Sequence, residues 1–385
     1  MLCGFYLTDF RQLEEQSRWM QYDRAFIAAS GGAYATLLEL REPADLALAR
    51  RMFLGRRGLG DRMRDVGIVF SREIHMSDDA GRFTSLRQPL RPNTQLISPD
   101  TVREIRKGDY LVLHEGKTIH QFSDRRTILP RYAISLAKLA DKPTSIESTL
   151  YYRAACREIA RSTDERTAIA AILPPGVLCG HTISVERRPA RRPNAAALSL
   201  VGIMNSFAFD WLLRQKAAIH VSLYILSELP VPDFAPSSDR FLAHASLRLS
   251  CNHRGFMPLW REQLADAWLE SSPVHSWPVI AAEADRWGLR AAMDAVVAHA
   301  YRLNHAQYER ILAAFSHKSF REAPALCLAA FDELACKGLA RFCRDHDPYC
   351  DIPLVTSQAL PVIRLPNAVV RQRSLLPAGT GPVRA

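Results

Sequence analysis

The sequence predicts a mixed α+β fold, with strands and helices in the first part of the chain and mostly helices after Phe241. Short runs rich in Val, Ile, Leu and aromatic residues, of which Tyr110–His114 is the clearest, are typical of strands. After Phe241, apolar residues recur at helical spacing. The chain has 385 residues, 48% of them apolar, so it is long enough for two or three globular units of about 100 to 200 residues.

The expected elements can be placed in chain order. Cys3–Asp9 alternates like a strand and has no preceding element to cover its edge. Helical patterns follow at Arg11–Ala29 and Pro43–Arg57, and further strands are expected at Val66–Phe70 and Tyr110–His114. The glycines near position 58 follow no expected strand and lack GK[ST], which favours a turn over a phosphate loop.

The second half begins with a helical pattern over Leu198–Gln215, interrupted at Asn205-Ser206. A strand is expected at Ala217–Leu229. Further helices are expected at Arg286–Leu303 and Gln307–Phe315. Beyond Pro348 the composition shifts to proline, valine and arginine, which predicts a flexible or peripheral tail.

The charge balance favours a polyanionic partner. The formal net charge is +10 and the isoelectric point is about 9.4. Only 7 of the 50 basic residues are lysines, and the 43 arginines can contact phosphate or guanine in bidentate fashion. A GC-rich genome would produce the same excess of arginine, and the sequence does not separate the two causes.

Other sequence features indicate a cytoplasmic protein without a metal site. No run approaches about 18 apolar residues, and MLCGFYLTDF lacks the pattern of a secretion signal, so no membrane association is expected. The eight cysteines form no CxxC pair. Cys336, Cys343 and Cys350 recur every seven residues, which on a helix places them too far apart to ligate one ion. We therefore expect reduced structural thiols.

The segment Arg157–Pro175, REIARSTDERTAIAAILPP, has the composition of a loop that contacts nucleic acid. Guanidinium and hydroxyl groups both donate hydrogen bonds to phosphate oxygens. The candidate contacts are three arginines and three hydroxyl residues: Arg157, Arg161, Arg166, Ser162, Thr163 and Thr167. The alternative is a capping box, in which Ser162 and Glu165 open an ordinary helix from Ala168 and the arginines are merely solvated.

Further candidate contacts flank this segment. EGKTIHQFSDRR follows the strand Tyr110–His114 and is too polar for a core strand, and its candidates are Lys117, His120, Gln121 and Arg125. Arg187 and Arg188 belong to a basic run that could extend the same electropositive surface, and Lys216 ends the helix begun at Leu198. The alternative interpretations are a solvated loop for the run and neutralisation of the helix dipole for Lys216.

A magnesium nuclease is a separate alternative. Pro99 and Asp100, followed by Glu115-Gly116-Lys117, match the loose pattern PD…ExK, in which two carboxylates hold the ion and the lysine helps activate water. However, Ser98-Pro99-Asp100 also has the pattern of a helix start, with proline at the first helical position.

Several motifs in a fixed order carry a family resemblance over about Gly4 to Leu339. They are GFYLTD at Gly4–Asp9, FSREIHMSDDAGRF at Phe70–Phe83, LHEGKTIHQFSDRR at Leu113–Arg126, the segment Arg157–Pro175, LVGIMNSFAFDWLLRQK at Leu200–Lys216, LYILSELPVP at Leu223–Pro232 and YRLNHAQYERILAAF at Tyr301–Phe315. The chain resembles the C-terminal, target-recognition half of type IIG restriction-modification adenine-specific DNA methyltransferases and the related phage-exclusion methylases.

The resemblance implies a target-recognition α/β unit and a helical domain that grip double-stranded DNA while a separate catalytic domain methylates adenine. The catalytic motifs themselves are missing. The chain has no [DNS]PP[YFW] tetrapeptide and no strand followed by FxGxG for S-adenosylmethionine, and Asp347-Pro348-Tyr349 lacks one proline and is assigned to chance. No catalytic residue and no cofactor are therefore expected in this chain, and S-adenosylmethionine is expected on a catalytic partner.

The resemblance also suggests four regions. They are an edge or remnant of a methyltransferase-type sheet with helices at 1–60, a target-recognition α/β domain at 61–235, a helical domain at 236–345 and a tail at 346–385. The uncovered first strand would complete the sheet of a separately encoded catalytic polypeptide. Alternatively, the chain is a truncated remnant without autonomous function.

Overall fold

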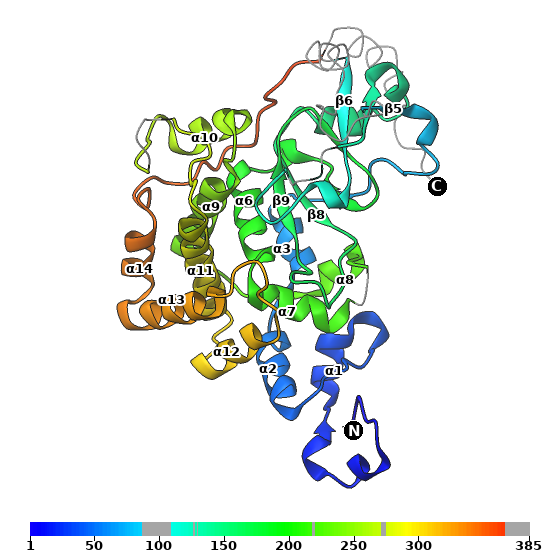
Figure 1. The fold of residues 1–385 in the computed structure, drawn as a ribbon, viewed down its shortest axis with the longest axis vertical. Helices are drawn as coiled ribbons and strands as arrows, with labels where there is room; N and C mark the ends of the chain where they lie inside the picture. Colours follow the sequence, from blue (N-terminus) through cyan, green and yellow to red (C-terminus); the bar gives the residue numbers. More distant parts are fainter. Residues whose placement is uncertain (87–108, 126–127, 129, 218–219, 271–274, 366–385) are drawn as a thin grey trace, which may run out of the picture.

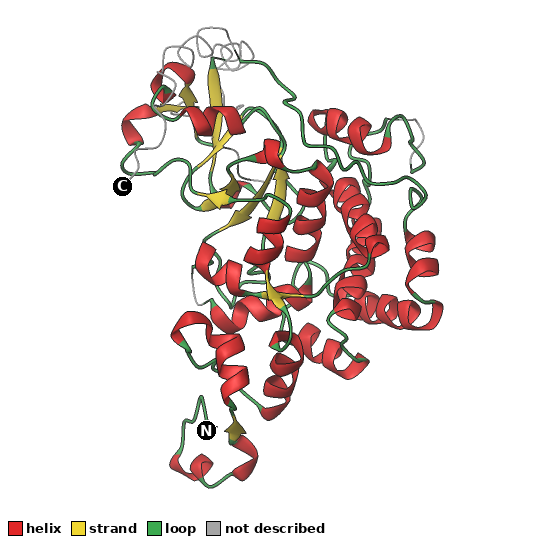
Figure 2. Cartoon of the chain, turned by 180° about the vertical axis from the view of Figure 1, so that it is seen from behind, coloured by secondary structure: helices red, strands yellow, loops and turns green. Residues whose placement is uncertain are grey.

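The computed structural model describes residues 1–86, 109–125, 128, 130–217, 220–270 and 275–365, and it confirms the mixed α+β fold. The long axis runs from the N-terminal helices to the sheet that contains β5 and β6 (Figure 1). Helices after α8 gather along one side of the molecule, and the two larger sheets lie toward the other (Figure 2).

Two four-stranded sheets form the strand-rich part. In the central sheet the order is β4-β11-β8-β9 and all neighbours are antiparallel, and in the outer sheet the order is β10-β6-β7-β5 with β10 and β6 parallel. The strands are β1 Leu2–Cys3, β2 Met20–Gln21, β3 Arg57–Gly58, β4 Phe70–Ser71, β5 Phe83–Ser85, β6 Tyr110–His114, β7 Tyr132–Ser135, β8 Arg153–Arg157, β9 Ala170–Leu173, β10 Val177–Cys179, β11 Ile183–Glu186 and β12 Pro230–Val231.

The α-helices are α1 Arg24–Gly31, α2 Pro43–Phe53, α3 Leu59–Asp65, α5 Pro143–Ser148, α6 Asn194–Met204, α7 Phe207–Lys216, α8 Leu223–Glu228, α9 Pro236–Ser250, α10 Met257–Leu264, α11 Glu283–Ala300, α12 His305–Ala313, α13 Ala323–Lys337 and α14 Leu339–His346. Short 3-10 turns join several of them, including Gly116–Thr118 after β6. Among the described residues, no single helix is both long and apolar enough to cross a membrane, although α6 and α7, bent by 68° at their junction, pass that test as a pair.

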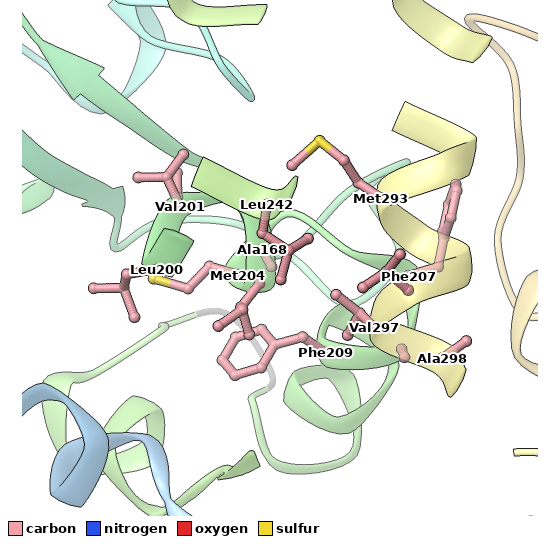
Figure 3. Close-up of a cluster of buried hydrophobic side chains, with 14 of the residues drawn as sticks. Ala168, Leu200, Val201, Met204, Phe207, Phe209, Leu242, Met293, Val297 and Ala298 are labelled. Carbon is pink, nitrogen blue, oxygen red and sulfur yellow. The ribbon is translucent and has the colours of Figure 1, made fainter. Parts of the chain in front are cut away.

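One hydrophobic core runs through most of the chain. It extends from Met20 to Tyr349 and includes residues from each of the expected regions. Side chains of α6, α7, α9 and α11 converge in it, with Met204, Phe207 and Val297 among those at the centre (Figure 3). The boundary expected near 235 is therefore crossed by continuous packing, because α6 on one side of it packs on α9 on the other.

The junction of α6 and α7 holds the edge of the central sheet. Asn205, in the break between the helices, accepts the backbone N–H of Ala170 through Oδ1 at 2.9 Å and donates to the carbonyl of Ala170 through Nδ2 at 2.9 Å. This amide thus satisfies both backbone groups of Ala170 at the edge of β9, where the carbonyl also accepts the N–H of Phe122 at 3.0 Å. Ser206 then caps α7 by accepting the N–H of Phe209.

Several sequence predictions are confirmed. β6 has the expected bounds Tyr110–His114, and the helical pattern over Leu198–Gln215 is interrupted at Asn205-Ser206 as predicted. Helices α2, α11 and α12 cover most of the segments expected to be helical at those places.

Other predictions are wrong. Of the strand expected at Ala217–Leu229, Leu223–Glu228 is instead helix α8, because Ser222 caps it by accepting the N–H of Ile225. Of the strand expected at Cys3–Asp9 only Cys3 belongs to a strand, β1, which pairs with β2 within the chain. Val66–Phe70 contributes only Phe70 to β4. The alternative of a helix from Ala168 is also wrong, because Ala170–Leu173 is β9.

The described part of the expected tail is attached to the rest of the molecule. The backbone N–H of Ala359 donates to the carbonyl of Arg192, and that of Val362 donates to the carbonyl of Leu150. Tyr349 is buried against Trp260. Residues 349–365 therefore run along the folded unit as a bound strap.

Candidate nucleic-acid interface

The strand β8 ends at Arg157, and the loop 115–125 packs against that end. The Nη2 of Arg157 donates to the carbonyl of Ile119. A Cβ on Gly116 would lie 3.0 Å from the carbonyl oxygen of Thr182 and 3.2 Å from the Cγ of Arg157, so this close approach favours glycine. The structure thus brings together the two segments that the sequence singled out.

A closed turn follows β8. The backbone N–H of Arg161 donates to Asp164 Oδ2 at 2.9 Å, and Thr167 Oγ1 donates to the carbonyl of Arg161 at 2.9 Å. Helix α7 fixes this turn from the other side, because Arg214 Nη2 donates to the carbonyl of Glu165 at 2.9 Å. The side chain of Arg161 is left exposed, and it makes no ion pair within 4 Å with a carboxylate of the described chain.

The exposure of the hydroxyl candidates in this turn differs. Thr163 is exposed and Ser162 is partly buried. Thr167 is fully buried, and its hydroxyl is used within the turn. Thr163 and Ser162 can therefore contact a partner without rearrangement, whereas the prediction for Thr167 is corrected to a structural role.

Arg166 is also buried, in an ion pair that the sequence analysis did not predict. Its Nε lies 2.7 Å from Asp210 Oδ2, and its guanidinium carbon lies 4.1 Å from the centre of the Phe207 ring. Asp210 is fully buried and accepts the backbone N–H groups of Thr167 and Ala168 as well. Arg166 therefore anchors the turn to α7, so the prediction of an exposed DNA contact is corrected in that respect.

A cavity of about 310 Å³ lies where the turn, the loop 115–125 and α11 meet. Its lining contains three arginines and two histidines beside aromatic and acidic side chains. The lining residues are His120, Arg157, Asp164, Glu165, Arg166, Ile169, Phe207, Trp287, Arg290, His317 and Ser319. Asp164 and Ser319 are exposed, which indicates that the cavity opens to solvent.

Arg290 is the cavity residue that the sequence analysis missed. Its guanidinium carbon lies 3.9 Å from the centre of the Trp287 ring, and its Nη2 donates to Gln121 Oε1. Burial, followed by the repulsion from Arg166, lowers the pKa of Arg290 to about 10. The spacing of Trp287 and Arg290 places them on one helix face, which was the available signal.

The remaining candidates of the loop 115–125 divide by burial. Gln121 is buried, and its Nε2 donates to the carbonyl of Ala168 at 2.8 Å, so it supports the site without facing a partner. Arg125 is exposed, with its Nε 3.9 Å from Asp124 Oδ2, and Lys117 is partly buried with its Nζ 3.6 Å from Glu115 Oε1. His120 is partly buried and lines the cavity.

The basic pair Arg187 and Arg188 lies elsewhere. Both side chains are exposed and directly follow β11. Ile183, at the start of β11, pairs with Arg157, so Arg187 is four residues farther along the strand, roughly 13 Å at the usual rise. The pair therefore lies at the opposite strand end and does not join the cluster around Arg157.

Lys216 is committed to an ion pair. Its Nζ lies 2.7 Å from Glu228 Oε2, and only 9% of its side chain is exposed. The prediction of a DNA contact at this lysine is therefore corrected to a link between α7 and α8.

The nuclease pattern finds no support in the described residues. Asp100 and Pro99 lie outside them. Glu115 is buried and accepts Arg131 Nε at 2.8 Å; although burial raises the pKa of this carboxyl, Arg131 and Lys117 outweigh that effect and lower it. Within the described ranges, no group of three or more His, Cys, Asp or Glu side chains could hold a metal ion.

The segment Asp347-Pro348-Tyr349, which partly matches the catalytic pattern [DNS]PP[YFW], is part of the core. Asp347 is buried, with Oδ2 2.8 Å from His244 Nδ1, and Tyr349 is buried against Trp260. These residues therefore stabilise the helical part of the chain.

Neither the scan against protein-family models nor the search of curated proteins finds a match to this sequence.

Proposed function

We propose that this chain is the DNA-binding specificity part of an adenine-specific DNA methyltransferase or restriction-modification system and works with a separately encoded catalytic domain. The motif order supports the enzyme class. The geometry adds one observation that carries the proposal: two segments with DNA-contact composition, 117–125 and 157–167, pack together at one end of β8.

The charges at this place suit a polyanion. Arg161 and Arg125 are exposed. Arg157 and Lys117, which belong to the same two segments, are partly buried. Arginine forks match phosphate oxygens and the guanine edge, and Thr163 and Ser162 add donors within the same turn. The contacts that we propose are therefore Arg157, Arg161, Ser162, Thr163, Lys117, His120 and Arg125, with Arg166 and Gln121 as supports.

The remaining activity belongs to the proposed partner. Methyl transfer needs a pocket for a flipped adenine and bound S-adenosylmethionine. The sequence lacks both motifs, so the catalytic polypeptide would supply the adenine pocket and the cofactor while this chain holds the duplex.

Titration of a labelled duplex by fluorescence anisotropy tests the proposal. We expect Arg161→Gln to weaken binding roughly fivefold to tenfold at about 0.1 M salt, since one phosphate contact contributes about 0.9 to the slope of log affinity against log salt. Arg341→Gln is the matched control, because Arg341 is also highly exposed but lies on α14, away from β8 (Figure 1).

Two outcomes would contradict the proposal in different ways. Equal affinities of the two variants would remove the turn 161–167 from the interface. An absence of duplex binding by the wild-type chain would reject the DNA-binding function and favour the alternative of a remnant without autonomous function.

A further inference from the structure

Two buried or partly buried guanidinium groups face the cavity without a carboxylate for each of their donor nitrogens. Arg166 donates to Asp210 through Nε and to the carbonyl of Asn205 through Nη2. Its buried Nη1 has no hydrogen-bond partner among the described residues. Arg290 makes no ion pair within 4 Å with a described carboxylate, and its Nη2 donates to the neutral amide of Gln121. A buried donor that stays unpaired carries a desolvation cost.

The acidic groups around the cavity are already engaged. Glu165 Oε1 accepts both the backbone N–H and the hydroxyl of Ser319, each at 2.7 Å. Asp164 Oδ2 accepts the N–H of Arg161. Asp294, which is on α11 but does not line the cavity, accepts the N–H of Phe207 through Oδ1. Burial also raises the pKa of Asp294 to about 6, because desolvation disfavours its charged form.

The aromatic wall positions Arg290 and is not free to stack a base. One face of Trp287 is covered by Arg290 at 3.9 Å, and the ring is stacked with that of Phe320 at a centroid distance of 5.1 Å and an interplanar angle of 15°. The stack therefore restrains the guanidinium beside the cavity. Such pre-organisation suits recognition of an oxyanion more than of an aromatic base.

We infer that the cavity is a binding site for one phosphate group, held by Arg290 and Arg166, with Arg157 and His120 also in its lining. The phosphate supplies a counter-charge for Arg290, which has no ion pair within 4 Å among the described carboxylates, and a further acceptor beside Arg166, whose Nε is already paired with Asp210. Only the source of the phosphate rests on the proposed function: a backbone phosphodiester if the chain binds DNA, or a free phosphate or nucleotide otherwise.

Calorimetric titration with inorganic phosphate, at constant ionic strength set by chloride, tests the site itself. We expect saturable one-to-one binding by the wild-type chain. Arg290→Gln should bind roughly 10- to 100-fold more weakly, because a charge-assisted hydrogen bond is lost. Arg187→Gln, at an exposed arginine remote from the cavity, should bind as the wild type does.

A second variant covers a possible loss of stability in Arg290→Gln. Arg290→Lys keeps the charge but loses the bidentate donor geometry, so its affinity for phosphate should fall between those of the wild type and Arg290→Gln. Thermal melts of all variants show whether each is folded. Absence of saturable phosphate binding by the wild type, or equal binding by Arg290→Gln, would overturn the inference.

The duplex arm identifies the source. If the phosphate is a DNA phosphodiester, Arg290→Gln should lower the salt slope of duplex binding by about 0.9, and inorganic phosphate should compete with the duplex. If the wild type binds phosphate but no duplex, the phosphate site stands with a free ligand as its occupant, and only the proposed function fails.

Discussion

At the scale of single residues, the same side-chain type serves opposite purposes within ten positions. Arg161 is exposed and Arg166 is buried, although both lie in one short turn with similar neighbours in the sequence. The difference arises from Asp210, 44 residues farther along the chain, which pairs with Arg166. No local pattern contains this partner, so the composition of Arg157–Pro175 predicts donors without showing which of them face solvent.

The pair of Arg166 and Asp210 gives a stability prediction. Asp210→Asn should lower the free energy of unfolding by about 3 to 5 kcal/mol, because it leaves the buried guanidinium of Arg166 without its counter-charge. Chemical denaturation followed by circular dichroism measures the change. In the control Asp61→Asn, whose partner Arg64 is 76% exposed, the loss should stay below about 0.5 kcal/mol. Equal losses in the two variants would show that the buried pair does not anchor the turn.

At the scale of elements, the site depends on how closely the loop 115–125 approaches β8 and β11. The loop is held at Gly116, whose N–H donates to Thr182 Oγ1 at 2.8 Å. The carbonyl of Thr182 cannot retreat freely, because it accepts the N–H of Glu158 at 2.9 Å. The position of His120 and Lys117 relative to Arg157 therefore depends on this glycine contact as well as on the hydrogen bond from Arg157 to Ile119.

Gly116→Ala tests this dependence. The added Cβ would be 3.0 Å from a fixed carbonyl oxygen, so the variant should lose about 1 to 2 kcal/mol of unfolding free energy. The control is Gly81→Ala, where an added Cβ meets no atom within 4 Å and stability should hardly change. A Gly116→Ala variant as stable as the control would mean that the loop approaches β8 less tightly than described.

The elements also show what the sequence could and could not predict. β6 is predictable because its apolar residues form a short strand-like run, and the break between α6 and α7 is predictable because the polar pair Asn205-Ser206 interrupts an apolar helical pattern. The apolar side chains of residues 217–229 predict a strand, but the N-cap at Ser222 starts helix α8 within this range. The Arg290 contact with Gln121 joins positions 169 residues apart, and such long-range packing has no signature in a single sequence.

At the scale of the whole molecule, some of the arginines have a structural role. Arg153 and Arg192 are fully buried in ion pairs with Glu73 and Glu186, at 2.6 and 2.5 Å. Such pairs add nothing to the net charge of +10, and that charge by itself does not show where a DNA site lies. What supports binding is the placement of a few accessible arginines at one end of β8.

The dependence of wild-type duplex affinity on salt tests the central claim most directly. If Arg125, Arg157, Arg161 and Lys117 each neutralise one phosphate, log affinity should fall with log salt with a slope of about −3.6, or steeper if Arg290 takes a fifth. A flat response over the same range of salt would contradict DNA binding through this interface.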